Sequence, residues 1–256
     1  MILVADVGNT NITLGVYDAG KIIANWRLSS QVASTEDEIY VRIRLLCEAM
    51  SISLDKVKGM AVGSVVPSVS VTMKRFAEKW LDVNYLEVSA ASNVGLEILY
   101  DKPENVGADR ICNAVAGYKL FGGPLIVVDF GTATTFDIIS REGAYSGGLI
   151  APGLESAVNS LHRFAAKLPL VDLQFPKQLI GKTTESSMQA GLMYGGAEMV
   201  EGLIRCLKDE INDNPAVIAT GGLANTLLPR TPSVDRVIPF LTLDGLLQIY
   251  EMNFHG

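Results

Sequence analysis

Two short stretches of the chain place a carboxylate, a glycine and several small polar residues in the same order. An apolar run leads to Asp6 and then Gly8, and a second apolar run leads to Asp129 and then Gly131. Asparagine or threonine follows each glycine. A tight glycine turn leaves backbone N–H groups pointing outward, and threonine hydroxyls add donors, so each turn has the chemistry to hold phosphate oxygens. Asp129, at the edge of its turn, could also hold a cation or a water molecule beside those oxygens.

Both stretches predict a β-hairpin. In each, apolar and β-branched residues predict a buried strand that ends at the aspartate, and a second apolar strand returns after the polar turn. With Asp6 aligned on Asp129 the two glycines coincide, whereas Thr10 lies two residues after its glycine and Thr132 lies one residue after. We infer an internal duplication of a phosphate-binding hairpin. The alternative is that any α/β protein has hydrophobic strands that end in Asp and Gly.

A third candidate lies between the hairpins, where Asp109 and Arg110 stand side by side before a predicted helix over residues 111–120. A carboxylate next to an obligate cation stays ionised and can act as a general base for a hydroxyl group. The residues alone also allow a structural role, with Asp109 as a helix cap and Arg110 on the surface.

The elements that must position these residues alternate between strands and helices. This alternation, with the duplicated hairpins, implies two α/β domains with mixed sheets. Ligand sites in such sheets lie at strand ends, so we expect both turns to face one central cleft. The strongest turn signal in the middle of the chain is Gly122-Gly123-Pro124. We therefore predict a domain boundary there, with domains at 1–121 and 122–256. The predicted helices are 39–50, 69–81, 111–120, 154–165, 186–209 and 244–253.

Three motifs together resemble a known family. The paired D-x-G hairpins resemble the actin-like ATPases, a ribonuclease H-like superfamily that includes sugar kinases and chaperone ATPases. Within it, DVGNTNITLG from residue 6, GADR at 107–110 and DFGTATTFD from residue 129 resemble the type III pantothenate kinases over nearly the whole chain. The resemblance implies ATP-dependent phosphorylation of pantothenate to 4'-phosphopantothenate, the first step of coenzyme A biosynthesis.

The resemblance also implies roles for individual residues. Asp109 is expected to accept the proton of the substrate's primary alcohol, and Arg110 to bind the substrate and the transferring phosphoryl group. The substrate-binding residues implied by the family are Tyr100, Gly107, Ala108, Asp109, Arg110 and Thr184. The implied nucleotide-binding residues are Asp6, Val7, Gly8, Asn9, Thr10, Asn11, Ile12, Thr13 and Thr132.

Two cation sites are expected. The resemblance implies a monovalent cation, K⁺ or NH₄⁺, held by Asp129 beside the nucleotide phosphates. Mg²⁺ accompanies ATP, and we expect Asp6 to contact it, through a water molecule in our hypothesis, because phosphoryl transfer needs charge neutralisation. Thr134 and Thr135 are either part of the phosphate clamp or ordinary strand residues. Gly221-Gly222 is either a turn beside the adenosine or a common strand end.

A glycine–lysine–threonine run at 181–183 resembles the end of a P-loop, but we reject that interpretation. The motif needs a glycine at position 176, which is Pro176, and irregular sequence rather than a strand precedes the run. The resemblance to the pantothenate kinases instead assigns Thr184 to the substrate.

Composition excludes several classes of function. The net charge is −7 and no cluster of five Lys or Arg occurs, which argues against a nucleic-acid partner. No apolar run reaches the roughly 18 residues of a membrane span, and no leader precedes the first strand, so we expect no membrane partner. The three cysteines are scattered without a C-x-x-C pair, and neither His162 nor His255 has a partner at metal-ligand spacing. A reduced cytoplasm is the expected location.

Two further expectations concern assembly and activity. The resemblance implies a homodimer, with the long helix after residue 186 as its interface. The alternative function is a non-catalytic ATP-binding regulator, or a transcription accessory factor, of the same fold. The presence of Asp6, Asp109, Arg110 and Asp129 favours catalysis, because a sensor need not keep a base.

Overall fold

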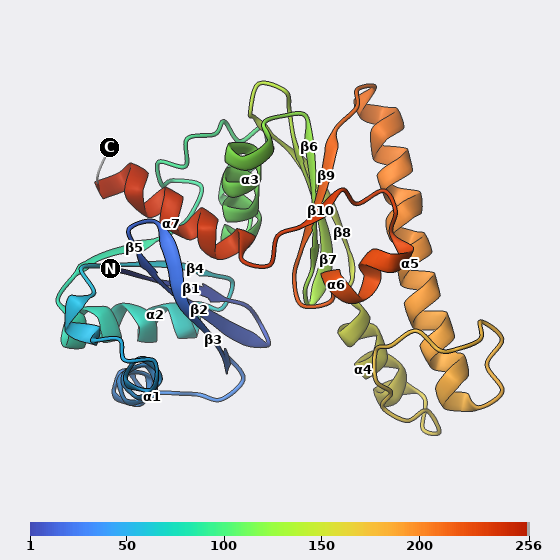
Figure 1. Ribbon diagram of the computed structural model, residues 1–256, viewed down its shortest axis with the longest axis horizontal. Helices are drawn as coiled ribbons and strands as arrows, with labels where there is room; N and C mark the ends of the chain where they lie inside the picture. The colour runs from blue at the N-terminus through green and yellow to red at the C-terminus, as the bar shows by residue number, and fades with distance from the viewer. Residues whose placement is uncertain (255–256) are drawn as a thin grey trace. The chain divides into compact units, whose positions relative to one another are not determined.

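The computed structural model describes residues 1–254, so His255, predicted to lie in a tail, is outside the described residues. The chain forms two compact units (Figure 1). Unit 1 consists of Met1–Lys119 together with the segment from Phe240 onward, and unit 2 consists of Leu120–Pro239. The predicted second domain, 122–256, therefore needs a correction. Its last helix belongs to unit 1, because the apolar residues of that helix pack on the first sheet.

Unit 1 is built on a five-stranded mixed sheet in the order β3-β2-β1-β4-β5. Strands β1, β2 and β3 form an antiparallel meander, and β4 and β5 extend the sheet parallel to β1. The central strand β1 is buried along most of its length, as its continuous apolar sequence predicts. The bounds are β1 Ile2–Val7, β2 Asn11–Asp18, β3 Lys21–Ser29, β4 Gly59–Ser64 and β5 Asn84–Glu87.

Helices cover both faces of this sheet. On one face, α1 (Glu36–Ala49) and α2 (Pro67–Phe76) enclose an apolar core that includes Leu3, Ile43 and Met73. The last helix, α7 (Leu241–Phe254), contacts β1, β2 and β4, and its Leu243 lies against Gly15. The remaining helix of unit 1 is α3 (Ala108–Phe121). Short 3-10 turns occur at Leu54–Lys56 and Pro103–Asn105.

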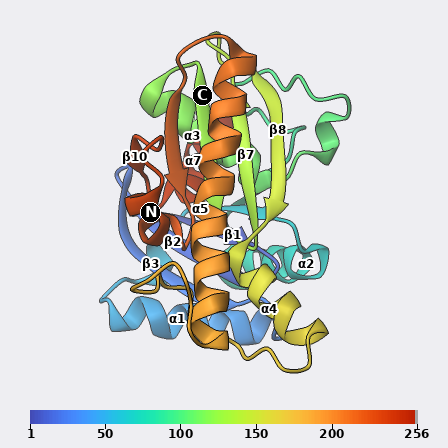
Figure 2. The same cartoon turned by 90° about the vertical axis from the view of Figure 1, so that its right-hand side faces the viewer.

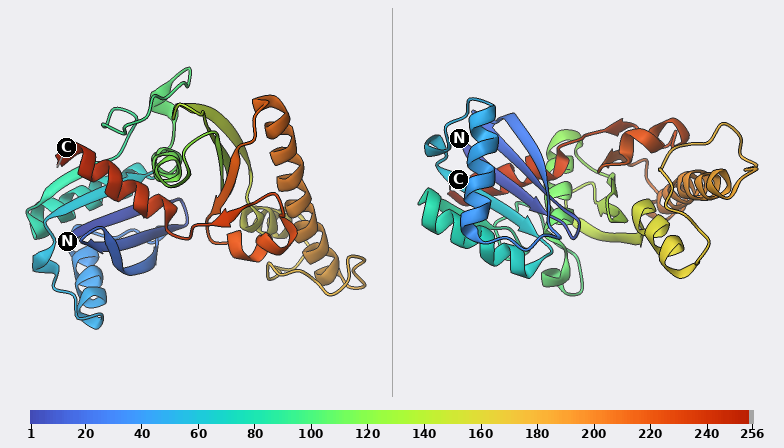
Figure 3. Two further views of the ribbon diagram at one scale, coloured as in Figure 1. Left: turned by 45° about the horizontal axis from the view of Figure 1, so that its top comes forward. Right: turned by 90° about the horizontal axis from the view of Figure 1, so that it is seen from below.

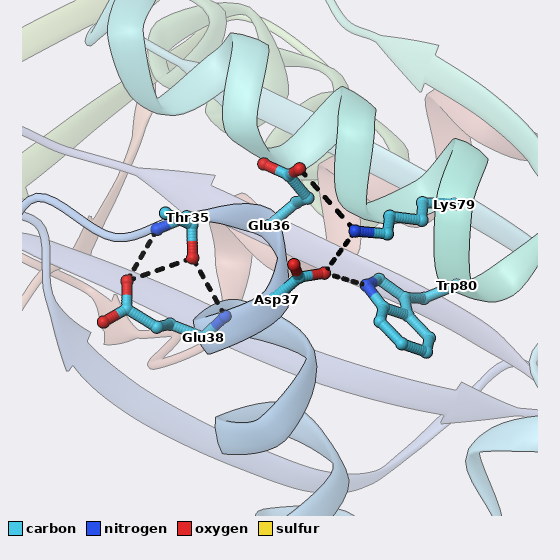
Figure 4. A network of polar contacts seen from close by, with 6 residues as sticks. All are labelled: Thr35, Glu36, Asp37, Glu38, Lys79 and Trp80. Atoms are coloured by element: carbon cyan, nitrogen blue, oxygen red, sulfur yellow. Dashed lines mark hydrogen bonds and ion pairs between the residues drawn. The ribbon is translucent and has the colours of Figure 1, made fainter.

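Polar contacts join α1 to the π-helical turn Ala77–Leu81 that follows α2 (Figure 4). Asp37 accepts hydrogen bonds from Lys79 Nζ at 2.7 Å and from Trp80 Nε1 at 2.9 Å. The Trp80 ring also stacks on Tyr40, with 4.0 Å between ring centroids. Thr35 and Glu38 form a capping box at the start of α1, as the Ser/Thr-rich helix entry predicts. These contacts fix the α1–α2 layer at the edge of unit 1.

Unit 2 repeats the topology of unit 1. Its sheet has the order β10-β9-β6-β7-β8, which read backwards matches the first sheet strand for strand. Again one antiparallel meander, β6-β7-β8, is extended by strands parallel to the first of the three. The predicted α/β fold class with two duplicated mixed-sheet units is confirmed. The bounds are β6 Leu125–Phe130, β7 Ala133–Ile139, β8 Tyr145–Pro152, β9 Ala216–Thr220 and β10 Arg236–Val237.

The long helix α5 (Thr184–Ile211) runs along the sheet of unit 2 (Figure 2). It packs Met193, Val200 and Ile204 against apolar residues of β6, β7 and β9. The helix is continuous through Gly195-Gly196, where the sequence allowed a break. Helix α4 (Leu154–Phe164) lies beside its N-terminal half (Figure 3), and the short α6 (Ala224–Leu227) continues into a 3-10 turn at Leu228–Arg230. Within the described residues, no helix is long and apolar enough to span a bilayer.

Candidate active site

The first hairpin joins β1 to β2 and carries Asp6 at its tip. Asp6 pairs across the two strands with Thr13, and both side chains are half-buried. The Gly8 N–H donates to the Asn11 carbonyl at 2.9 Å and closes the turn. Because directly opposite residues of an antiparallel pair point to the same face, the carboxylate of Asp6 and the hydroxyl of Thr13 lie together.

The second hairpin joins β6 to β7 with the same pairing. Asp129 pairs with Thr135, and both are again half-buried. The Gly131 N–H donates to the Ala133 carbonyl at 3.1 Å, so this turn is one residue shorter than the first. The difference explains why Thr132 lies one residue after its glycine and Thr10 two. Thr134 is buried, as a strand residue is, whereas Thr135 lies opposite the aspartate.

A glycine turn packs directly against Asp129. Strand β9 runs parallel to β6 and places Thr220 beside Asp129. The next residue, Gly221, has φ +92°, and a Cβ there would lie 2.5 Å from Asp129 Oδ1 and 2.6 Å from the Phe130 nitrogen. Only glycine fits this position, because both the backbone conformation and the space exclude a side chain.

The start of α4 supports the loop of the second hairpin from another side. A Cβ at Gly153 would lie 2.4 Å from the Thr132 carbonyl oxygen, so the two backbones are in direct contact. The Ser156 hydroxyl donates to the same oxygen at 2.6 Å. Ser156 could not be predicted as a site residue, since a serine in the first turn of a helix gives no sign of a distant partner.

The third candidate, Asp109, lies in the first turn of α3. The helix begins at Ala108, three residues before the predicted start, so Asp109 is inside the helix rather than its cap. Its Oδ1 accepts the N–H of Arg110 at 2.9 Å. A Cβ at Gly107 would lie 2.4 Å from the same oxygen. The carboxylate is therefore folded back over Gly107, while the Arg110 side chain is buried, with 6% of its surface exposed.

Unit 1 brings Asp6 and Asp109 close together. In β4, Gly63 is the parallel neighbour of Asp6, and a Cβ on Gly63 would lie 3.4 Å from Ala108 Cβ. Cys112, one turn after Asp109, is fully buried. Burial raises the pKa of the Cys112 thiol well above its ordinary value, and the negative charges of Asp6 and Asp109 raise it further.

The other predicted substrate residues lie apart from this pair in the sequence. Tyr100 is an exposed residue of the loop before α3. Thr184 is the first residue of α5 and lines a pocket of about 930 Å³ in unit 2, together with Lys182, Ser187 and Leu168. Irregular chain rather than a strand precedes Gly181, which agrees with the rejection of a P-loop.

The repeated sheet topology and the aspartate-tipped hairpins at the strand ends define a protein of the actin-like ATPase and kinase fold. Among solved structures, a Campylobacter jejuni protein described as a Baf family transcriptional activator matches with TM-score 0.60 and 20% identity, covering 99% of this chain and 100% of that one. The activator of 2-hydroxyisocaproyl-CoA dehydratase from Clostridium difficile, solved with bound ADPNP, matches with TM-score 0.56 and 13% identity, covering 99% and 94%. At these identities the likeness shows the fold alone.

Sequence comparison identifies the family within this fold. The family model for type III pantothenate kinase matches residues 2–206. A type III pantothenate kinase from Bacillus cytotoxicus is 46% identical over 253 residues, which cover 99% of this chain and 97% of that protein. The chain belongs to the type III pantothenate kinase family.

Proposed function

We propose that this chain transfers the γ-phosphoryl group of ATP to the primary alcohol of pantothenate, giving 4'-phosphopantothenate in the first step of coenzyme A biosynthesis. The observation that carries the proposal is the 46% identity with a type III pantothenate kinase over 253 residues. The aspartates at 6, 109 and 129 and Arg110 are all present, which favours catalysis over the regulatory alternative.

In the proposed reaction, Asp109 is the general base. The alcohol oxygen attacks the γ-phosphorus, its proton passes to the Asp109 carboxylate, and ADP leaves with the electron pair of the broken P–O bond. The position of Asp109 in the first turn of α3 supports this role, because the N-terminal end of a helix favours a negative charge. The carboxylate is also partly exposed, so a hydroxyl group can reach it.

The proposed substrate contacts come from Arg110, Tyr100 and Thr184, with the backbone of Gly107 and Ala108. Pantothenate is an anion and the protein carries a net charge of −7, so a local positive group must attract it. The Arg110 guanidinium supplies that charge, and it is buried where its field is least screened by water. Thr184 lines its pocket at the N-terminal end of α5.

The proposed nucleotide contacts are the first hairpin, residues 6–13, and Thr132 of the second. The turn at Gly8 and the exposed Thr132 present N–H and hydroxyl donors at the ends of buried strands. Phosphoryl transfer depends on positioning and charge stabilisation more than on covalent chemistry, so such donors are what the reaction needs.

The donor groups near both hairpins fit hard cations. Within residues 1–254, no group of three or more His, Cys, Asp and Glu side chains is placed to hold a metal ion. In the proposal, oxygen atoms of the nucleotide complete the ligands of each cation. Asp6 would contact Mg²⁺ through water, and Asp129 would hold K⁺ or NH₄⁺. When bound, these ions neutralise the charge that develops on the phosphates.

We also propose that the enzyme is a homodimer. Helix α4 and the chain between it and α5 expose large apolar side chains, and Phe164 and Ile180 are each 80% exposed. Exposed apolar side chains are a feature of interaction surfaces, and a second copy of the chain is the partner that the family implies. The exposed residues are Leu161, Phe164, Leu170, Leu179 and Ile180. The free cysteines Cys47, Cys112 and Cys206 are compatible with a reducing cytoplasm.

The direct test is a coupled assay of ADP release by the purified protein. We expect release only with ATP, Mg²⁺ and pantothenate together, stimulation by K⁺ or NH₄⁺ over Na⁺, and a product 80 Da heavier than pantothenate by mass spectrometry, the mass of one HPO₃ group. ADP release that is the same without pantothenate would contradict the proposal. Size-exclusion chromatography with light scattering tests the dimer.

A further inference from the structure

The N-terminal end of α7 is in contact with the first two turns of α3 (Figures 1 and 3). A Cβ at Gly245 would lie 2.1 Å from the carbonyl oxygen of Cys112 and 2.7 Å from its Cα. The Thr242 hydroxyl donates at 2.8 Å to Asn113 Oδ1, and the Asn113 side chain is fully buried. The backbones of the two helices therefore cross in direct contact, one turn after Asp109.

A second contact joins α3 and α7 to the sheet of unit 1. A Cβ at Gly63 would lie 3.1 Å from Leu246 Cδ2 and 3.4 Å from Ala108 Cβ. Leu246 of α7 and Ala108 of α3 thus meet over the β4 residue that neighbours Asp6. The end of the sheet, α3 and α7 converge where unit 1 brings its two carboxylates together.

We propose that Gly245 is a positioning residue for Asp109, an inference that rests on the proposed function. Helix α7 packs against α3 so closely that a side chain at position 245 would not fit between them. The added Cβ would meet the Cys112 backbone, so no change of rotamer can relieve the contact, and α3 and α7 must move apart by about 1 Å or more. Displacements of that size cost about 100-fold in rate when they misplace a catalytic group.

A matched control exists in strand β4, which packs against the same helix. Further along α7, a Cβ at Gly59 of β4 would lie 1.9 Å from the Tyr250 hydroxyl oxygen. Gly59 stands at the opposite end of β4 from Gly63, so Gly59→Ala disturbs the packing of α7 away from α3. Both variants add one methyl group at a packing contact of α7, but only Gly245→Ala adds it against α3, one turn after Asp109.

The experiment compares steady-state kinetics of Gly245→Ala and Gly59→Ala at a temperature where both are folded. We expect kcat of Gly245→Ala to fall about 100-fold with an altered pH profile, while KM for ATP stays within about twofold because the first hairpin is not on α3. Gly59→Ala should lose thermal stability but keep kcat within about twofold. Thr242→Val should lower kcat by a few-fold, and Thr242→Ser, which keeps the hydroxyl, should restore it.

Hydrogen exchange gives a readout that does not depend on activity. Peptides covering residues 107–116 should exchange faster in Gly245→Ala than in the wild type, and at the wild-type rate in Gly59→Ala. Unchanged kcat and unchanged exchange in folded Gly245→Ala would overturn the inference. A wild-type protein with no pantothenate-dependent ADP release would instead contradict the proposed function, and the exchange data would still decide whether α7 positions α3.

Discussion

The two hairpins share a backbone plan but differ in what stands beside the aspartate. In both, the aspartate pairs with a threonine across the hairpin, Asp6 with Thr13 and Asp129 with Thr135. In unit 1 the parallel neighbour of Asp6 is Gly63, which has no side chain and is covered by Ala108 at the start of α3 and by Leu246 of α7. In unit 2 the chain after Thr220 turns through Gly221 and closes against Asp129.

The difference suggests how one duplicated hairpin could serve two purposes. In unit 1, the start of α3, which carries Asp109, packs against the strand next to Asp6. In unit 2, the glycine turn contacts Asp129 and Phe130, and the start of α4 contacts Thr132, so both fix the hairpin loop. We infer that the first hairpin holds the nucleotide phosphates and Mg²⁺, and that the second holds the monovalent cation and adds Thr132 to the nucleotide contacts.

Among the variants that test this difference between the hairpins, Asp6→Asn is expected to have the largest effect on activity. Loss of one preorganised charged group at a phosphoryl-transfer site should lower kcat about 100- to 1,000-fold. Extra K⁺ should not restore activity, because we assign Asp6 to Mg²⁺ and the phosphates. Steady-state kinetics across K⁺ and Mg²⁺ concentrations measure this. Restoration by K⁺ would mean that the two hairpins do not differ in the proposed way.

Asp129→Asn is expected to have a smaller and different effect. The amide keeps the shape and one oxygen ligand but removes the charge that we propose for binding K⁺ or NH₄⁺. We expect the K⁺ concentration for half-maximal activity to rise by about tenfold, with partial recovery of kcat at high K⁺, because a weakened site still fills at higher ligand concentration. A loss of kcat that no K⁺ concentration relieves would argue against the cation assignment.

Gly221→Ala tests the glycine turn of unit 2. The added Cβ meets Asp129 Oδ1 and the Phe130 backbone, and φ of +92° is strained for alanine. We expect about 1–3 kcal/mol of lost stability and a several-fold rise in KM for ATP. The matched control is Gly202→Ala in α5, where a Cβ meets nothing within 4 Å and should be neutral or stabilising. Thermal unfolding and ATP titration of both variants measure the contrast.

The smallest expected effect is on thermal stability, and it concerns a hydrogen bond between the first hairpin and α7. Tyr17 of β2 donates a hydrogen bond to Asp244 of α7, whereas Ile139 occupies the corresponding place in β7. Burial raises the pKa of the Asp244 carboxyl, and the Tyr17 hydrogen bond partly opposes the rise. The folded protein therefore favours the neutral acid. This contribution is complete below the unfolded pKa of about 3.9 and is lost as pH rises through the folded pKa.

Asp244→Asn removes that titration while keeping an acceptor for Tyr17. We expect the Tm of the variant relative to wild type to increase as pH rises from about 3.5 to 7, because only the wild type must bury a carboxylate. Thermal unfolding across this pH range measures it. A difference that does not vary with pH, or that falls, would show that the pair is not held as described.

Much of this architecture could be predicted from local sequence. The apolar runs that end at Asp6 and Asp129 predict strands because no other element suits them, and their shared order predicts the duplicated topology that the two sheets show. The one-residue offset between Thr10 and Thr132 was visible in the sequence. Its cause, a shorter turn in the second hairpin, needed the strand register.

Long-range packing explains what the sequence did not reveal. The domain assignment of α7 was wrong because its apolar residues suit either sheet, and only the fit of Gly245 against Cys112 and of Leu243 against Gly15 shows which one it covers. The start of α3 was placed too late because Gly107-Ala108-Asp109 reads as a loop until the Asp109 carboxylate is seen folded over the glycine. The site roles of the individual residues stay predictions that the variants above test.

The most direct measurement of the central claim is single-turnover phosphoryl transfer by Asp109→Asn, followed by rapid quench with ATP and pantothenate saturating. The variant keeps the size of the side chain and the oxygen that accepts the Arg110 N–H, but it cannot take a proton. We predict that the chemical step slows by about 100- to 10,000-fold while ATP binding is unchanged. Near-wild-type phosphoryl transfer by the folded variant would contradict the assignment of the base.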